Sequence, residues 1–182
     1  MGPRHSCLLH GIRQRYQKAG RAILHGALTI LTVSDEFTRE SLAIEVGTSL
    51  TAQRVVATLA GAIAERGRAP LYLRSDNGPE FVALALRGFL RGRGVTTAYI
   101  EPGSRWQNGF AESFHSRFRD EFLEREVFLG VVDAQVRTRI WRRWYNEERP
   151  HSRLGYQTPR EFAARWQAEQ AEKAGANKHF GT

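Results

Sequence analysis

Apolar and polar positions in the first third of the chain predict two neighbouring strands. Residues 27–33 form an apolar run with several β-branched side chains, and residues 41–46 place an apolar side chain at every second position. The segment 34–39 between them is short and polar. Two such runs joined by a short turn are typical of antiparallel strands that lie side by side.

A different period follows. Between residues 51 and 66 the apolar positions recur every four residues, which predicts an amphipathic helix. The segment 71–73 predicts a short buried strand, and Pro79 is an acceptable first residue for the next helix. Residues 96–100 predict another strand, whereas the segment 101–108 has no hydrophobic period and predicts a loop.

Phenylalanines at four-residue steps predict a long helix that begins near residue 108. They are Phe110, Phe114, Phe118 and Phe122. At about 100° per residue, Glu112 lies roughly 200° around the helix from Phe110 and points away from the aromatic face. His115 and Arg119 lie on the side of Glu112, so we expect all three to face solvent or a cleft.

Two more helices are predicted in the last third of the chain. Apolar residues at four-residue steps mark the first, which ends at Pro150; they are Val132, Val136, Ile140 and Trp144. Thr158 and Pro159 have the pattern of a cap followed by a first helical residue. Strands and helices mixed in this order favour one α/β domain with helices on both faces of the sheet.

Several side chains near the end of the first of these helices have two possible roles. The aromatic residues Trp141, Trp144 and Tyr145 are expected in the core or in a subunit contact. Arg142 and Arg143 are expected on the solvated face, with a phosphate contact as the alternative. For the segment 149–151, Arg-Pro-His, a structural role is favoured over DNA contact.

The composition of the chain agrees with a single domain, and its charge indicates which class of partner it binds. The chain has 182 residues, 41% of them hydrophobic, and a net charge of +8. Basic side chains, nearly all of them Arg, favour polyanions such as nucleic acid. Residues 1–34 hold five basic groups and no acid, and a genome's base composition can also enrich Arg, so charge supports this interpretation without establishing it.

Targeting signals are not expected. No apolar run approaches the roughly 20 residues that a membrane helix needs, and residues 7–9 are too few for the apolar part of a signal peptide. Cys7 is the only cysteine, which excludes an internal disulfide. We therefore expect a cytoplasmic protein that does not associate with a membrane.

Two acidic residues form the candidate catalytic pair. Asp76 follows an apolar strand, Glu112 lies in the first turn of a helix, and 35 residues separate them. Alone, each has an ordinary interpretation, because Asp-Asn-Gly is a common turn and an acid is favoured at a helix start. Together they are the residue types that hold Mg²⁺, or Mn²⁺ as a substitute, for phosphodiester chemistry.

Four segments carry a resemblance to a known family: LTVSDEFTRE (31–40), LRSDNGPEF (73–81), residues 99–122 and WYNEERPHSRLGYQTPREF (144–162). The chain from residue 28 to 165 resembles the integrase-like catalytic core of bacterial insertion-sequence transposases of the two-reading-frame type, relatives of retroviral integrases. The resemblance implies a ribonuclease H-like mixed sheet flanked by helices. It also implies metal-dependent DNA strand cleavage and transfer through an Asp-Asp-Glu triad.

Position by position, the resemblance makes Asp76 the second acid and Glu112 the third, both catalytic and metal-binding. DNA contacts are implied for four further residues, namely Arg105, Asn108, His115 and Arg119. The first acid has no match, because the strand that should carry it precedes residue 28 and residues 1–34 contain no Asp or Glu. Asp35 is the nearest acid, at a position that the family does not count in its triad.

This departure divides the expected chain into three parts. Residues 1–25 are an atypical basic segment from a shifted frame or a spurious start, residues 26–167 are the integrase-like core, and residues 168–182 are a frayed tail. The first strand is then missing or replaced, which would expose a sheet edge. Catalysis is expected to be impaired.

Three functions therefore stay open. The chain is a transposase core that acts on transposon ends and target DNA, a non-catalytic fragment that binds DNA or modulates an intact transposase, or a ribonuclease H-like nuclease. Its expected partners are DNA and a second subunit, either a copy of itself or an intact transposase.

Overall fold

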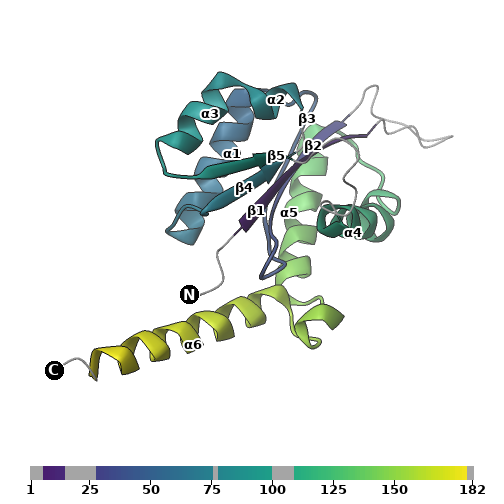
Figure 1. The fold of residues 1–182 in the computed structure, drawn as a ribbon. Coiled ribbons are helices and arrows are strands. Elements are labelled where there is room, and N and C mark those ends of the chain that lie inside the picture. The colour runs from purple at the N-terminus through teal and green to yellow at the C-terminus, as the bar shows by residue number, and fades with distance from the viewer. Residues whose placement is uncertain (1–5, 15–27, 76–77, 100–108, 180–182) are drawn as a thin grey trace.

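A five-stranded mixed sheet forms the centre of the molecule (Figure 1). The computed structural model describes residues 6–14, 28–75, 78–99 and 109–179. The strand order is β3-β2-β1-β4-β5. The strands are β1 (Ser6–Gln14), β2 (Leu28–Asp35), β3 (Ser41–Gly47), β4 (Tyr72–Ser75) and β5 (Thr96–Tyr99).

Strand β1 occupies the middle of this sheet. It pairs antiparallel with β2 over eight positions, and parallel with β4 over four. Strands β2 and β3 pair antiparallel, as the alternation in residues 41–46 predicts, and β4 and β5 pair parallel. The ribonuclease H-like mixed sheet with helices on both faces is thereby confirmed.

Of the two alternatives expected for the first strand, missing or replaced, the structure shows the second, because residues 6–14 fill its place. Both sides of β1 are paired, so no central edge is exposed. The physical reason is that sheet pairing uses backbone N–H and C=O groups, and every residue except proline supplies both of them. What the unusual sequence changes is the set of side chains on the strand, and that set contains no acid.

Three helices cover one face of the sheet (Figure 1). They are α1 (Ala52–Arg66), α2 (Pro79–Val82) and α3 (Leu84–Arg91). The side chain of Thr51 caps α1, and Gly67 ends it in the left-handed conformation, where a side chain would be strained. Their buried core joins nine residues: Leu31, Val33, Val55, Leu59, Leu73, Phe81, Leu86, Leu90 and Val95.

The other face is covered by α4 (Gly109–Phe118), a π-helical turn at Arg119–Leu123 and α5 (Val131–Glu147). Phe114, Phe118 and Phe122 are buried here, as their spacing predicts, while the side chain of Phe110 lies outside the described residues. Because α4 directs this aromatic stripe into the core, its opposite side is left to solvent.

Helix α5 confirms the prediction of a helix, but the apolar residues that mark its period are not on its buried side. Val132, Val136, Ile140 and Trp144 mark the helix and yet lie exposed, with Val132 at 71% and Ile140 at 65% exposure. The buried side consists of Ala134, Thr138, Trp141 and Tyr145. The aromatic rings decide which side of α5 is buried, since Trp141 and Tyr145 pack against Phe114 at centroid distances of 6.0 and 5.3 Å.

Helix α6 (Pro159–His179) follows a short 3₁₀ turn at Ser152–Leu154. Thr158 and Glu161 form the expected cap, because each side chain accepts a hydrogen bond from the other residue's backbone N–H, at 3.2 and 2.9 Å. The helix continues through residues 168–179. Fraying of that tail stays a prediction, as does the boundary at residue 25. In the part of the chain that the structure describes, no helix is long and apolar enough to cross a membrane.

Candidate active site

Helix α4 presents Glu112 to solvent in its first turn, as the helical period predicts. The carboxylate forms no ion pair with any described residue, so its oxygens are available to a cation. Asp76 follows Ser75, the last residue of β4, and lies outside the described residues together with Arg105 and Asn108.

His115, one turn after Glu112, fastens α4 to the sheet. Its Nε2 lies 3.0 Å from Oγ1 of Thr32 in β2, and the ring is half-buried. The prediction that His115 faces solvent or a cleft is thus only partly right, because the ring reaches back to the sheet. Arg119 is exposed at the start of the π-helical turn, as expected. A DNA contact stays a prediction for both residues.

The strand register locates the position on β1 that is nearest to the end of β4. Leu9 pairs with Ser75, the last residue of β4, so His10 is the next residue of β1 after the last pair between the two parallel strands. His10 in turn pairs with Thr32 of β2, the residue whose hydroxyl contacts His115. Backbone positions from β1, β2, β4 and α4 therefore converge at this end of the sheet.

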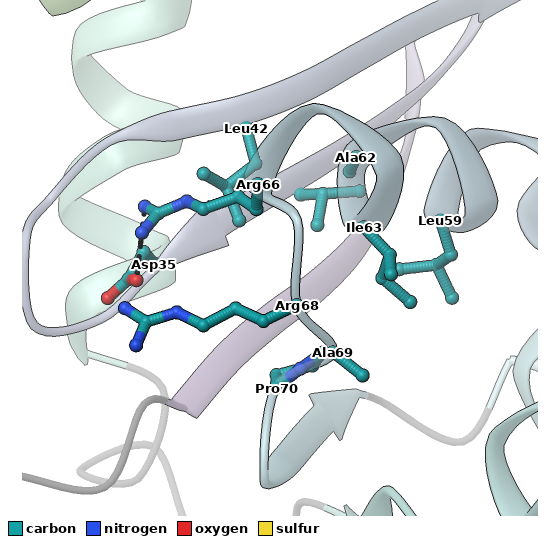
Figure 2. Close-up of a pocket in the computed structure, with 10 residues that line it drawn as sticks. Asp35, Leu42, Leu59, Ala62, Ile63, Arg66, Arg68, Ala69 and Pro70 are labelled. Carbon is teal, nitrogen blue, oxygen red and sulfur yellow. Dashed lines mark ion pairs between the residues drawn. The ribbon is translucent and has the colours of Figure 1, made fainter. Parts of the chain in front are cut away.

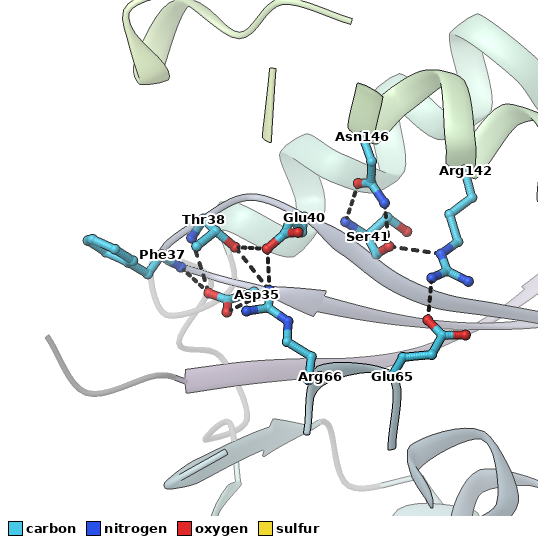
Figure 3. A network of polar contacts seen from close by, with 9 residues as sticks. All are labelled: Asp35, Phe37, Thr38, Glu40, Ser41, Glu65, Arg66, Arg142 and Asn146. Carbon is cyan, nitrogen blue, oxygen red and sulfur yellow. Dashed lines mark hydrogen bonds and ion pairs between the residues drawn. The ribbon is translucent and has the colours of Figure 1, made fainter. Parts of the chain in front are cut away.

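Asp35, the nearest acid upstream of Asp76, has a structural role (Figure 3). It is 1% exposed, and its Oδ1 accepts hydrogen bonds from the backbone N–H groups of Phe37 and Thr38, at 2.9 and 3.1 Å. Its Oδ2 lies 3.2 Å from a guanidinium nitrogen of Arg66. Arg66 also pairs with Glu40, whose pKa is raised by burial and lowered in part by that arginine.

The position of Asp35 separates it from Glu112. Asp35 lines a cavity of about 30 Å³ with Leu59, Ala62 and Arg66 of α1, on the sheet face opposite to α4 (Figures 1 and 2). Such a volume holds about one water molecule. Asp35 therefore closes the β2–β3 turn, and it does not join Glu112 in a shared cation site.

Arg142 was expected on the solvated face of α5, and the structure contradicts this. Its Nε donates to the backbone carbonyl of Ser41 at 3.0 Å, and its guanidinium pairs with Glu65 of α1 at 2.9 Å (Figure 3). The amide of Asn146 also bonds both backbone groups of Ser41, at 2.8 and 2.9 Å. These contacts join α5 to the start of β3 and leave little of Arg142 free for phosphate.

A second concavity adjoins α4, and we name it the arginine cleft. It measures about 480 Å³, and its wall includes Gly109, Ser113 and Arg117 of α4, Arg39 of the β2–β3 turn, Tyr145, and the segment Arg149, Pro150, His151, Ser152, Arg153 and Tyr156. Sequence reasoning placed none of these arginines in a site. The Arg-Pro-His segment was the available signal, and it was interpreted as structural.

Electrostatics in this cleft are governed by its arginines. Burial, reinforced by Arg149 and Arg117, lowers the pKa of His151 to about 4. Burial also lowers the pKa of Arg39, and the charge of Arg153 adds to this effect. The imidazole is therefore neutral at pH 7, where the guanidinium groups carry the positive charge.

The next feature is the fit of the described residues to a divalent cation. Among the described residues no group of three or more His, Cys, Asp or Glu side chains is placed to hold a metal ion. Of the two predicted metal ligands, Glu112 lies among the described residues, and it supplies a hard, exposed carboxylate of the type that Mg²⁺ and Mn²⁺ prefer. Its fit to a cation depends on the acid that follows β4.

Comparison with known proteins gives a consistent family. The integrase core domain model matches residues 10–105, and a second integrase core domain model matches residues 93–159. An uncharacterized 39.2 kDa protein of insertion element IS476 from Xanthomonas euvesicatoria is 42% identical over 144 residues, which are 79% of this chain and 41% of the relative. The transposase of insertion element IS629 from Shigella sonnei is 25% identical over 75% of this chain and 46% of its own.

Another relative, the 31.7 kDa protein of insertion element IS407 from Burkholderia multivorans, is 41% identical over 76% of this chain and 50% of its own length. The chain thus spans about half, or less, of these curated relatives.

Solved structures support the fold. The catalytic core of HTLV-2 integrase, determined with magnesium in a dimeric form, superposes with a TM-score of 0.60 at 15% identity, over 84% of this chain and 92% of that core. The catalytic core of BIV integrase gives a TM-score of 0.58 at 17% identity, over 90% and 97%.

Proposed function

The chain belongs to the integrase core domain family, as an integrase-like core of the insertion-sequence transposase type, and from this we propose that its reaction is metal-dependent cleavage and transfer of DNA strands. The substrates are the ends of a transposable element and the target DNA. This chemistry would take place in the bacterial cytoplasm, at the nucleoid.

The contact between His115 and Thr32 carries the proposal. At 3.0 Å it fixes the first turns of α4 against β2, beside the central strand β1. This supports a position for Glu112 near the end of the sheet at which β4 ends, just before Asp76 in the sequence. A rigid helix and a strand end are the supports that a metal-binding pair needs, because coordination tolerates little displacement.

Asp76 and Glu112 would hold Mg²⁺ or Mn²⁺ in this reaction. When bound, the cation activates the attacking hydroxyl and stabilises charge on the phosphate. The protein's own contribution is to position the carboxylates and to bind the DNA backbone, with Arg119 exposed one turn beyond His115. Because no acid lies on β1, we propose that the chain's own activity is impaired.

Substituting His10 by Asp tests both parts of the proposal. The register places His10 beside the strand end that precedes Asp76, so an acid there would supply the third carboxylate. We expect His10→Asp to raise Mg²⁺-dependent strand transfer on the element's end sequences above that of the unsubstituted chain. Adding Glu112→Gln should abolish the gain.

Gly11→Asp is the matched control, since successive residues of a strand point to opposite faces of the sheet. It adds the same charge and should not raise activity. If the unsubstituted chain already transfers strands and Glu112→Gln stops it, impairment is refuted and the function stands. Hydrolysis without strand transfer would instead indicate a ribonuclease H-like nuclease.

A second candidate function is a non-catalytic subunit that modulates an intact transposase. The observation that favours it is the exposed apolar side of α5, which offers a surface to another subunit. Co-expression with an intact transposase of the same element tests it. Suppressed transposition and a mixed complex, together with no activity in His10→Asp, would select this function.

A further inference from the structure

The arginine cleft holds more positive charge than its own acids balance. Arg149 is paired with Glu121 through two contacts, at 2.8 and 2.5 Å. Arg117 and Arg153 form no ion pair within the described part of the chain, and none of the described residues in the cleft wall is acidic. Clustered guanidinium groups repel one another, so a bound anion would stabilise this arrangement.

His151 provides an independent sign of an absent partner. Its ring is only 4% exposed, one ring nitrogen bonds the backbone of Tyr145, and Nε2 has no hydrogen-bond partner among the described residues. Buried polar atoms are nearly always paired. An anion in the cleft would offset the charge of Arg149 and Arg117, raise the pKa of His151, and allow Nε2 to donate once protonated.

Backbone strain is also concentrated here. Arg39 and Tyr156 have φ angles of 64° and 63°, and they are the only non-glycine residues with positive φ in the described segments. Both belong to the cleft wall. Each such conformation costs of order 1 kcal/mol or more, and strain of this kind clusters at binding sites.

Tyr156 suggests which anion the cleft accepts. Its side chain is 77% exposed at the cleft, beside the arginines. An exposed aromatic ring next to cations is how proteins hold single-stranded nucleic acid, since guanidinium groups bind phosphates and the ring stacks on a base. Inorganic phosphate would bind the arginines but would not contact the ring of Tyr156.

We propose that the arginine cleft binds the backbone of a single DNA strand, with Tyr156 stacked on an unpaired base. The choice of DNA as the polyanion rests on the proposed function. The cleft wall includes Ser113, the residue after Glu112 on α4, so a strand in the cleft runs alongside the helix that bears the carboxylate. The cleft would hold DNA that has been opened next to the reacting phosphate.

Salt-dependent binding tests this proposal. The full chain is titrated with a labelled single-stranded oligonucleotide of about ten nucleotides over a range of salt, as are Arg117→Gln and Arg153→Gln. Each cleft substitution should reduce the slope of log K against log salt by about 0.7, the value for one lost phosphate contact on a single strand. Melting curves confirm that each variant is folded.

Arg93→Gln is the matched control. Arg93 follows α3 on the opposite face of the sheet, where it lies over the ring of Phe89 at 3.8 Å. The substitution Arg93→Gln removes the same charge as the cleft substitutions, and it should leave the slope of log K against log salt within about 0.2 of that of the unsubstituted chain. Equal slopes for the control and the two cleft variants would overturn the proposal.

Substitutions of Tyr156 separate a DNA strand from free phosphate. Tyr156→Ala should weaken oligonucleotide binding about fivefold or more, the lower end for a lost stacking contact, whereas Tyr156→Phe should bind as the original does. Inorganic phosphate that displaces the oligonucleotide, combined with no effect of Tyr156→Ala, would show a simple phosphate site and refute the proposal.

Failure of the proposal that the cleft binds DNA is distinguishable from failure of the proposed function. If Arg117→Gln and Arg153→Gln bind normally while His10→Asp still transfers strands, only the cleft is refuted. If the cleft variants lose binding while no variant shows metal-dependent activity, the cleft stands and the catalytic proposal fails.

Discussion

At the scale of single residues, Asp35 shows how one carboxylate can resemble a catalytic acid and serve the fold. Asp35 accepts two backbone hydrogen bonds from its own turn and faces Arg66 of α1, and its side chain is nearly closed to solvent. A carboxylate so fully engaged has few lone pairs left for a cation. The carboxylate of Glu112, in contrast, is exposed and forms no ion pair with a described residue.

Substitution of Asp35 should therefore affect stability and not chemistry. Asp35→Ala leaves Arg66 and two backbone N–H groups without this partner, and we expect a loss of about 3 kcal/mol in the free energy of unfolding. Asp35→Asn keeps an acceptor for the N–H groups and should lose less. Urea denaturation measures both values.

The control for this interpretation is activity in the His10→Asp background at a temperature where the protein is folded. Asp35→Asn should retain strand transfer there, whereas Glu112→Gln should not. Loss of activity in a folded Asp35→Asn variant would mean that Asp35 takes part in the reaction after all.

At the scale of elements, α5 has two apolar sides and the sheet buries only one. Trp141 and Tyr145 fit against the aromatic stripe of α4, with Trp141 and Phe118 4.7 Å apart between ring centroids. Val132, Val136 and Ile140 are left on the surface. A row of exposed apolar residues on a helix is a typical subunit contact.

Ile140→Glu should therefore reduce self-association without unfolding the chain. Ile140 is 65% exposed, so the change removes no core contact, and a charge on an apolar interface is costly to bury. Sedimentation velocity should show the unsubstituted chain as a dimer or larger species and the variant as a monomer. Arg143→Glu serves as the control, since Arg143 is 77% exposed on the same helix and pairs with Glu147.

A monomeric unsubstituted chain at tens of micromolar would refute this assignment for α5. A variant that melts at a much lower temperature would also count against it, because Ile140 would then contribute to the core.

At the scale of the whole molecule, the central strand comes from the segment that the sequence assigned to another origin. Strand β1 lies between β2 and β4, so it connects the antiparallel half of the sheet to the parallel half. The two buried cores lie on opposite faces of this one sheet. Without β1, the β2–β3 pair and the β4–β5 pair would no longer be joined in one sheet.

Deletion of residues 1–25 should therefore unfold the protein, even though residues 26–167 were expected to form the core. The shortened chain loses all pairing of β1 with β2 and β4. Circular dichroism and hydrogen exchange should show loss of cooperative unfolding and of protected β-strand amides. Deleting residues 1–5 is the control and should be tolerated, since β1 begins at Ser6.

Either result of this deletion bears on the origin of residues 1–25. A folded protein lacking residues 1–25 would show that the first strand is dispensable and that the expected domain boundary is correct.

Much of the fold could be predicted because its causes are local. The alternation in residues 41–46 and the four-residue period of the phenylalanines arise from side chains that face one core, and both correspond to observed elements. The capping pair Thr158 and Glu161 is likewise a local pattern. The candidate site was predicted only as far as the family resemblance reached, to Asp76 and Glu112.

The sequence by itself therefore determined most of the elements after residue 27, the family and the outward direction of Glu112, since helical and strand periods and motif residues are properties of the chain. Tertiary structure alone decided that residues 6–14 are the central strand, that Asp35 faces α1, and which side of α5 is buried. It also assembled the arginine cleft from the β2–β3 turn, α4 and the segment after α5. These features depend on contacts between residues far apart in the chain, and no local pattern specifies such contacts.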